Sequence, residues 1–312
     1  MTIAFRKIAV LGATGPTGVH LARVLTAAGA QVRVVSRSAE HLERVFGDQP
    51  VEQVAADMLD HRAALRAIED CDGVFDCIGL PAERLADHPR TARNIAAAVE
   101  QTGARAVHVS SYWAYLPVQH SPVSETHPRA GGSFPVRVRR ETEDILLDAG
   151  AAVLNLPDFY GPQVHTSTLQ NVLAEAAAGK TMHCIGSPDT PREYVYVPDA
   201  VHTAASVAAH ESAYGERWII PAPGSVTPRQ VAQIAGAHLG RSVAVRGAGP
   251  TMLRVLSLFN RDLRGFMPMV PYYLQPIAFD GSKLRALLGE IPATPYELAV
   301  PVTLDWLMQP RD

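Results

Sequence analysis

Cysteine is scarce in this sequence, and the few cysteines present form no recognisable pattern. The 312 residues include three cysteines, Cys71, Cys77 and Cys184. An odd count without the spacing of metal ligands excludes a disulfide framework and a cysteine metal site, and it is typical of reduced thiols in a cytoplasm. We therefore expect each cysteine to be a small buried hydrophobic side chain, and we expect no metal centre.

Long apolar runs are also missing. No stretch of about 18 uncharged apolar residues occurs, and Arg6 and Lys7 stand inside what would have to be the apolar core of a signal peptide. The sequence therefore predicts a cytoplasmic protein without a membrane partner. A formal net charge of −3 gives no electrostatic reason to expect a nucleic-acid partner.

The first half of the chain alternates short β-branched runs with helical patterns. The runs typical of strands are KIAVLG at 7–12, VRVVS at 32–36, VEQVAA at 51–56, DGVFDCIG at 72–79, RAVHVSS at 105–111 and AAVLNLP at 151–157. Between them lie segments rich in alanine and leucine with a helical period, closed by glycines at the C-cap position. This alternation predicts βαβ units and an α/β fold with a doubly wound parallel sheet.

Beyond residue 157 the composition changes. Prolines become frequent and the alternation loosens, so we expect residues 158–312 to form mainly a smaller mixed α/β lobe that binds the substrate. Residues 180–200 remain candidates for completing the main sheet. Leucines and phenylalanines at helical spacing predict a helix within 251–273. This helix either joins the core of the lobe, which we favour, or covers an apolar substrate.

One glycine-rich stretch has the pattern of a ligand-binding turn. The segment GATGPTG leaves the first predicted strand and opens a helix. Its glycines allow positive φ and close backbone approach, while the helix N-terminus offers N–H groups and partial positive charge to a pyrophosphate. The stretch predicts a Rossmann-type NAD(P)-binding domain over residues 1–157 rather than a mere turn. The residues expected to hold the dinucleotide here are Gly12, Thr14, Gly15, Pro16, Thr17 and Gly18.

The end of the second strand indicates which dinucleotide binds. NAD sites usually carry an acidic residue there, whereas this chain has Ser36 and Arg37 and no carboxylate before Glu40. A guanidinium beside hydroxyls suits a 2′-phosphate, so we predict NADP(H) in preference to NAD(H). The competing interpretation is a solvated arginine at the start of a helix.

Two further strand ends belong to the same predicted cleft. Asp57 and Met58 follow the third strand, where a carboxylate can accept a hydrogen bond from an adenine amino group. Ile78 and Gly79 follow the fourth strand, where a glycine lets the backbone pass close to the cofactor. Each pair is also compatible with an ordinary loop start.

Several motifs in order resemble those of the extended, atypical short-chain dehydrogenase/reductases, the class that includes the NAD-dependent epimerases and dehydratases of nucleotide sugars. They are GATGPTG, DMLD, VHVSSYWAY, SETHP, FYGP, REYVYVPDAV and the C-terminal FDGSKLRALLG with TLDWL, and they span nearly the whole chain. The resemblance implies a Rossmann cofactor domain, a C-terminal substrate lobe and chemistry at the nicotinamide. It also implies a homodimer paired through the helices near 84–101 and 134–149.

The resemblance implies that Ser111 hydrogen-bonds the reacting oxygen, although a serine after a strand also caps turns. The family relies on a Tyr-x-x-x-Lys pair, whose lysine lowers the pKa of the tyrosine. In this chain the corresponding helix places Pro135 and Arg139 there, or Val136 and Arg140 in the next register. Arg139 can still bind the ribose of the cofactor, but neither register supplies a tyrosine.

Two further residues of this chain correspond to positions of the family that contact the cofactor or the substrate. Pro157, in LNLPDFYGP, corresponds to a cofactor-contacting loop. Arg192 corresponds to a position that holds a phosphate in the sugar-nucleotide members, and the competing account is a salt bridge to Glu193 or Asp189.

Turnover would therefore need another proton donor. The candidates near the cleft are Tyr112, Tyr115, Asp158, Tyr160 and His165. The predicted function is an NADP(H)-binding dehydrogenase/reductase acting on a small, fairly apolar carbonyl or alcohol with a non-standard proton donor. The alternatives are a catalytically silent dinucleotide-binding protein and a nucleotide-sugar epimerase or dehydratase.

Overall fold

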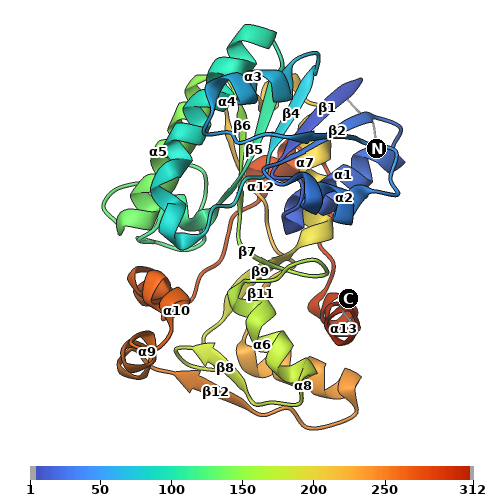
Figure 1. Cartoon of the computed structure of the whole chain (residues 1–312). Helices are drawn as coiled ribbons and strands as arrows, with labels where there is room; N and C mark the ends of the chain where they lie inside the picture. The colour runs from blue at the N-terminus through green and yellow to red at the C-terminus, as the bar shows by residue number, and fades with distance from the viewer. Residues whose placement is uncertain (1–4, 310–312) are drawn as a thin grey trace.

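A parallel seven-stranded sheet forms the centre of the larger domain in this computed structural model, which describes residues 5–309 (Figure 1). Its strand order is β10-β6-β5-β4-β1-β2-β3, and the order reverses direction between β1 and β4. The strands are β1 (Lys7–Leu11), β2 (Gln31–Ser36), β3 (Glu52–Ala55), β4 (Gly73–Asp76), β5 (Arg105–Ser111), β6 (Ala152–Leu156) and β10 (Arg217–Ile219). The predicted Rossmann-type α/β fold is confirmed.

Helices cover both faces of this sheet. One face carries α1 (Pro16–Ala27), α2 (Ala39–Phe46), α7 (Val197–Val207) and α12 (Ser282–Leu288), and the other carries α3 (His61–Ile68), α4 (His88–Thr102) and α5 (Phe134–Asp148). Alternate residues of β1 enter the two cores: Ile8 and Val10 pack on the first face, Ala9 and Leu11 on the second. Because both faces are covered, the strand reads as a continuous apolar run.

The division of the chain between domain and lobe differs from the sequence prediction. The strand that completes the main sheet is β10, which pairs with β6, whereas residues 180–200 contain β8 (Met182–Ile185) and β9 (Arg192–Tyr196) of smaller sheets. The helices α7 and α12 also return to the main domain. A strand as short as β10 leaves too little alternation for the sequence to reveal it.

The lobe lies at the carboxyl ends of the central strands (Figure 1). It contains a sheet β11-β9-β7, with β7 (Asp158–Tyr160) and β11 (Ser225–Val226), and a pair β12-β8, with β12 (Val245–Ala248). Its helices are α6 (Thr168–Ala177), α8 (Pro228–Leu239) and α13 (Tyr296–Met308), which share one apolar core with these strands. The lobe is thus mixed α/β, as predicted.

The segment 251–273 does not form one helix. It folds into α9 (Pro250–Ser257), α10 (Arg261–Phe266), the 3₁₀ helix η4 (Met267–Met269) and α11 (Val270–Tyr273). Asn260 interrupts the helix, because its side chain accepts a hydrogen bond from the Leu263 N–H at 2.9 Å and starts α10. The other 3₁₀ helices are η1 (Ala82–Asp87), η2 (Tyr112–Tyr115) and η3 (Glu211–Ala213).

The three cysteines are free thiols. Cys71 and Cys184 are buried, as expected, whereas Cys77 is half-buried. Burial raises the pKa of the Cys71 thiol to about 11, which makes it unreactive at neutral pH. Within residues 5–309, no helix is both long and apolar enough to cross a membrane.

Candidate cofactor and active site

The turn between β1 and α1 requires its first glycine. Gly12 has φ of +72°, a region that favours glycine, and a Cβ at this position would lie 2.9 Å from the Cys77 carbonyl oxygen and from the Ile78 Cα. The loop after β4 therefore passes directly over Gly12. This contact brings the ends of two neighbouring strands together at the carboxyl edge of the sheet.

The third glycine lets the helix approach the strand. A Cβ on Gly18 would lie 2.5 Å from the Gly12 carbonyl oxygen and 2.7 Å from the Ala13 Cα. Gly15 is less restricted, since its φ is −78° and a Cβ there would lie 3.3 Å from the same oxygen. The sequence alone cannot separate these roles, which depend on how α1 packs over the turn.

The N-terminus of α1 remains open to a ligand. Gly15 is its N-cap and supplies no side-chain acceptor, and Pro16 in the first turn has no N–H to satisfy. The next N–H groups, of Thr17 and Gly18, thus have no capping side chain among the described residues. Such a backbone cradle with a positive helix end fits a pyrophosphate, so the residues present fit a dinucleotide.

We expect Gly18→Ala to weaken cofactor binding at least tenfold. The added methyl group meets backbone atoms, so α1 must move away from the turn that forms the cradle. Titration of the protein with NADPH, followed by fluorescence, measures the change. Gly249→Ala is the matched control, because Gly249 has φ of −75° and an added Cβ there meets no atom within 4 Å; this variant should bind NADPH like wild type, and equal losses in both variants would contradict this role for Gly18.

The end of β2 presents hydroxyl groups and a free guanidinium. Thr14 Oγ1 and Ser36 Oγ lie 3.2 Å apart, so the glycine turn and the end of β2 share one edge. Arg37 is exposed and has no acidic partner among the described residues, while Ser38 caps α2 by accepting from the His41 N–H. The predicted pair Ser36 and Arg37 therefore lies beside the dinucleotide cradle.

Asp57 and Met58 follow β3 at the same edge. The Asp57 carboxylate accepts from the Leu59 N–H at 3.0 Å and remains exposed, whereas Met58 is buried. Asp57 lines a shallow cavity of about 340 Å³ together with Asp60, Arg90 and Asn94. Both positions border the predicted adenine end of the cleft.

Buried polar side chains hold the loop after β4. Asp76 accepts from the Ile78 N–H at 3.1 Å and contacts His108 Nδ1 at 2.8 Å, and His88 Nε2 accepts from the Leu80 N–H at 3.3 Å. Burial lowers the pKa of His88 to about 3, so its ring stays neutral and can accept. These contacts fix the backbone that carries Ile78 and Gly79 past the cleft. Sequence reasoning missed them, because the three side chains come from separate elements.

Helix α5 carries both arginines that the two sequence registers align with the family's lysine, and their side chains have different surroundings. Arg140 is engaged with backbone carbonyl groups, donating to Ala114 and Gly131 at 2.6 Å each and also to Leu116. Arg139 has no hydrogen-bond partner among the described residues, and burial lowers its pKa although Asp76 and Glu143 oppose this effect. Arg139 is therefore the arginine that remains available to a ligand.

The tyrosine position is apolar in both registers. Pro135 and Val136 are buried in the first turn of α5. Neither side chain carries a proton that it could exchange.

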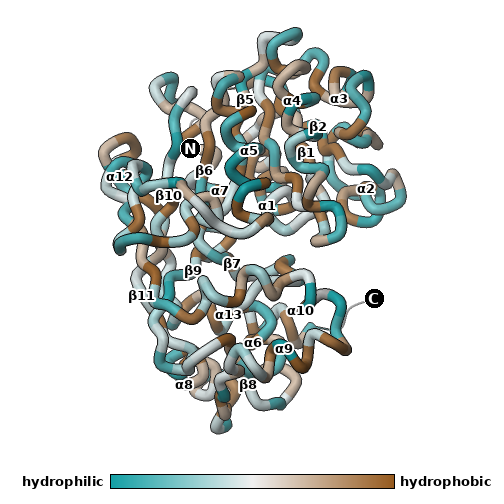
Figure 2. The backbone as a smooth tube through the Cα atoms, turned by 90° about the vertical axis from the view of Figure 1, so that its left-hand side faces the viewer, coloured by the Kyte–Doolittle hydropathy of each residue, from teal (hydrophilic) through white to brown (hydrophobic). Residues whose placement is uncertain are grey.

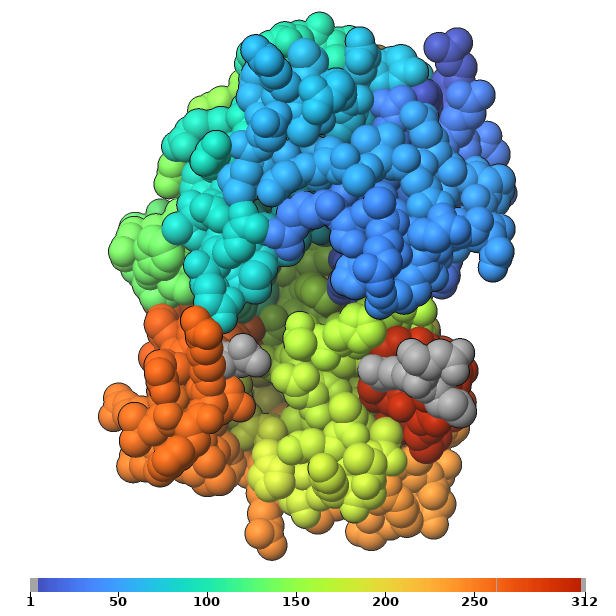
Figure 3. Space-filling model, in the orientation of Figure 1, coloured from blue at the N-terminus to red at the C-terminus, as the bar shows by residue number. Residues whose placement is uncertain are grey.

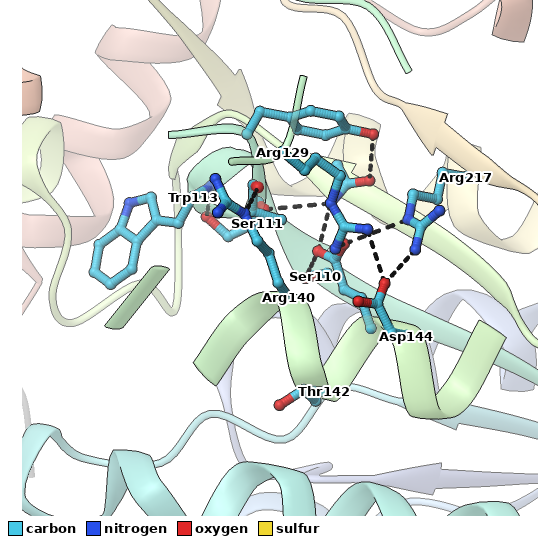
Figure 4. Close-up of polar contacts among 12 residues, drawn as sticks. Ser110, Ser111, Trp113, Arg129, Arg140, Thr142, Asp144 and Arg217 are labelled. Atoms are coloured by element: carbon cyan, nitrogen blue, oxygen red, sulfur yellow. Dashed lines mark hydrogen bonds and ion pairs between the residues drawn. The ribbon is translucent and has the colours of Figure 1, made fainter. Parts of the chain in front are cut away.

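Ser111 ends β5 at the carboxyl edge of the sheet. Its Oγ accepts from the Trp113 N–H at 3.3 Å, which is the capping contact that competes with a catalytic role. Figure 4 shows Ser111 near Trp113, while Ser110 points into a different polar cluster. In that cluster the buried Glu143 accepts from Ser110 at 2.5 Å and from Asn155 at 2.6 Å.

A buried hydrogen bond between Arg192 and Tyr112 connects the lobe to the larger domain. Arg192 donates to the Tyr112 hydroxyl at 2.9 Å and to the carbonyl oxygens of Tyr272 and Gln275 at 3.2 and 2.9 Å. Its guanidinium also stacks over the Tyr273 ring at 4.5 Å. Arg192 makes neither of the salt bridges considered above, to Glu193 or to Asp189, and its donors are turned away from solvent. Burial raises the pKa of Tyr112, which makes it a poor proton donor.

Tyr160 lies away from the cleft. Its side chain is fully buried in the core of the lobe, stacked near Tyr196 and Tyr296, and its hydroxyl has no hydrogen-bond partner within the described residues. Burial raises its pKa. Tyr160 is the last residue of β7, and its side chain packs inside the core of the lobe.

Asp158 lies where the domain meets the lobe. Its carboxylate accepts from the Tyr273 hydroxyl at 2.9 Å and from Thr168 Oγ1 at 2.9 Å. Burial raises its pKa, although Arg192 and the two hydrogen bonds oppose this. Leu156 pairs with Ser111 in the sheet, so the chain passes through the buried Pro157 and places Asp158 just beyond the strand end next to Ser111.

Aromatic side chains complete this part of the site. Trp113 Nε1 donates to the Tyr273 hydroxyl at 3.2 Å, and Phe266 lies 6.2 Å from the Trp113 ring and 5.2 Å from the Tyr273 ring. Figure 3 shows a hollow between the N-terminal domain and the lobe, bordered on one side by the residues of α9 and α10. Neither Trp113 nor Tyr273 is a site residue by sequence reasoning, because they are far apart in the chain.

The chain was compared with known protein families. Residues 12–146 match a family model described as NAD(P)H-binding. The match begins at Gly12 and ends within α5, so it contains the glycine cradle, the strand ends and Ser111. The comparison with curated proteins gives no match.

Solved structures share the fold over nearly the whole chain. A UDP-glucuronic acid 4-epimerase from Bacillus cereus, in complex with UDP-glucuronic acid and NAD, is 15% identical with a TM-score of 0.81, covering 96% of this chain and 98% of that one. For a UDP-glucose 4-epimerase from Bifidobacterium longum with NAD+ and UDP the values are 18%, 0.78, 96% and 97%. For a dTDP-glucose 4,6-dehydratase from Bacillus anthracis with NAD they are 15%, 0.79, 96% and 96%. The predicted resemblance to the epimerase/dehydratase class is confirmed in the fold.

Proposed function

We propose that this protein is an NADP(H)-dependent oxidoreductase acting on a small, fairly apolar carbonyl or alcohol, with Asp158 as its proton donor and acceptor. The observation that carries the proposal is the connected set Ser111, Trp113, Tyr273 and Asp158 at the carboxyl ends of β5 and β6. It supplies a hydroxyl for a substrate oxygen and a titratable group at the same edge of the sheet. With no tyrosine at the expected position, Asp158 is the candidate acid or base that we favour, because its carboxyl group belongs to this connected set and burial raises its pKa above the usual value.

The proposed roles of the protein groups follow from their contacts. When bound, the nicotinamide supplies or accepts a hydride. Ser111 orients the substrate oxygen, Asp158 holds or takes the proton at that oxygen, and Arg139 holds the cofactor ribose. Tyr273 and Thr168 keep the carboxyl group of Asp158 in one orientation.

The proposed substrate class rests on what surrounds Asp158. Tyr273 contacts Asp158, and Trp113 and Phe266 contact Tyr273 in turn, so these three side chains present aromatic surface at this part of the site. The arginine that could neutralise a sugar-nucleotide phosphate, Arg192, is buried and donates from Nη1 and Nη2 to protein oxygens, while its Nε has no partner among the described residues. An uncharged, largely apolar molecule suits such walls better than a diphosphate does.

A nucleotide-sugar epimerase is the second candidate, because the fold is shared with epimerases. Melting curves distinguish the two. We expect NADPH to raise the melting temperature and UDP-glucose or UDP-glucuronic acid to add nothing further. A further rise with a UDP-sugar, at concentrations where UDP alone has no effect, would favour the epimerase.

We expect Arg37→Ser to lower NADPH affinity about tenfold to hundredfold and to leave NADH affinity unchanged, because the side chain would pair only with the 2′-phosphate. Binding titrations with both cofactors measure the effect. Arg44→Ser is the control, since Arg44 pairs with Glu40 on the same helix. Equal affinity of the wild-type protein for NADPH and NADH would remove the predicted preference.

A further inference from the structure

The segment 250–266, called here the α9–α10 hairpin, exposes large apolar side chains. The exposed fractions are 49% for Met252, 54% for Val255, 44% for Leu256, 65% for Leu258 and 87% for Phe259. Single exposed apolar residues are normal on protein surfaces, but this group falls within eight consecutive positions. A continuous apolar surface of this kind indicates a partner.

Side-chain hydrogen bonds fix the turn at the tip of the hairpin. Arg264 donates from Nε to the Ser257 carbonyl oxygen at 3.1 Å and from Nη2 to the Leu258 carbonyl oxygen at 2.7 Å. These bonds satisfy two carbonyl groups at the end of α9, and the Asn260 side chain satisfies the Leu263 N–H at the start of α10. Leu258 and Phe259 are thereby held in the turn, where they project outward.

The hairpin is flanked by positive charge. Arg246, Arg254, Arg261 and Arg264 stand against a single acidic residue, Asp262, between positions 246 and 279. Arg261 lies 3.8 Å from Glu83, a long contact between exposed groups, and Arg254 has no acidic partner within the described part of the chain. The excess is local, since the whole chain has a net charge of −3.

The inner side of the hairpin faces the site. Phe266 packs near Trp113 and Tyr273, and a Cβ on Gly265 would lie 3.1 Å from the Ala82 side chain of η1. Figure 1 places α9 and α10 at the outer edge of the lobe, and Figure 2 shows the brown, hydrophobic stretch between the two helix labels. The hairpin therefore joins the border of the active-site hollow to an apolar, cationic outer surface.

We propose that the α9–α10 hairpin docks on the surface of an anionic lipid bilayer. The apolar tip enters the interface between headgroups and acyl chains, and the flanking arginines contact the anionic headgroups. A second copy of the chain fits less well, because a symmetric pair would bring arginines against arginines. The sequence predicts no membrane partner because the chain has no apolar run long enough to span a bilayer. Docking on the bilayer surface does not need such a run. The apolar and basic residues that would dock come together as one patch only in the folded hairpin.

Sedimentation with vesicles tests this proposal on the full chain. We expect binding to vesicles of phosphatidylcholine mixed with phosphatidylglycerol and little binding to phosphatidylcholine alone. The double variant Leu258→Ser/Phe259→Ser should bind the mixed vesicles at least tenfold more weakly. Arg254→Ser should weaken this binding about fivefold.

Matched controls use the same changes elsewhere. Leu298→Ser/Val302→Ser removes apolar side chains that are 62% and 48% exposed on α13, and Arg66→Ser removes an exposed arginine of α3; both should bind vesicles like wild type. NADPH binding by every variant shows that it is folded. Absence of vesicle binding, or equal losses in the controls, would overturn the proposal, as would a dimer that the tip variant converts to a monomer.

Discussion

Asp158→Asn is expected to lower turnover by about 10²–10⁴-fold, the usual contribution of a positioned acid or base. Asparagine fills the same space and can still accept from Tyr273 or Thr168, so the site should keep its shape. NADPH affinity should stay within about twofold, because Asp158 belongs to the proton path and not to the dinucleotide cradle. Steady-state rates and NADPH titrations on the same preparations separate the two effects.

The pH dependence follows from the raised pKa of Asp158. As the acid in carbonyl reduction, Asp158 must be protonated, so reduction should be fast below its pKa and fall as pH rises through it. Thr168→Val removes a hydrogen bond to the carboxylate, and its profile should shift to higher pH. A profile that is unchanged in Thr168→Val, with activity retained in Asp158→Asn, would assign the proton to another group.

Glu143→Ala is expected to lower the free energy of unfolding by about 3 kcal/mol or more. Glu143 is fully buried and accepts from Ser110, Asn155 and Arg129, so its removal leaves buried donors without an acceptor (Figure 4). Urea unfolding followed by circular dichroism measures the change. The neighbouring Glu141→Ala breaks only the exposed pair with Arg93 and should cost less than about 1 kcal/mol; similar losses in both variants would contradict a structural role for the buried cluster.

The larger domain was predictable because its strands are buried on both faces and alternate with regular helices. The runs at 105–111 and 151–157 correspond to β5 and β6 within one residue at each end, and GATGPTG forms the turn that its glycines require. The lobe was harder, since strands as short as β7 and β11 take their conformation from their neighbours and not from a period of their own.

The residues of the candidate site also differ in how well the sequence could predict their positions. Residues next to strand ends, such as Ser111 and Arg37, could be located because the ends of parallel strands meet at one edge. The burial of Tyr160 in the core of the lobe could not be predicted, since the direction of a strand side chain depends on the packing of the lobe. The contact between Tyr273 and Asp158 joins residues 115 positions apart, and the local sequence around neither residue predicts this contact.

Hydride transfer is the most direct test of the central claim, that this chain turns over a nicotinamide cofactor without the family's tyrosine. NADPH carrying deuterium at C4 is incubated with the protein and a panel of apolar aldehydes and ketones, and the products are analysed by mass spectrometry. We predict that at least one product gains a deuterium with the wild-type protein and that this label falls by about 10²-fold or more with Asp158→Asn. If the protein binds NADPH in titrations but transfers deuterium to no substrate, it is a silent dinucleotide-binding protein and the account is contradicted.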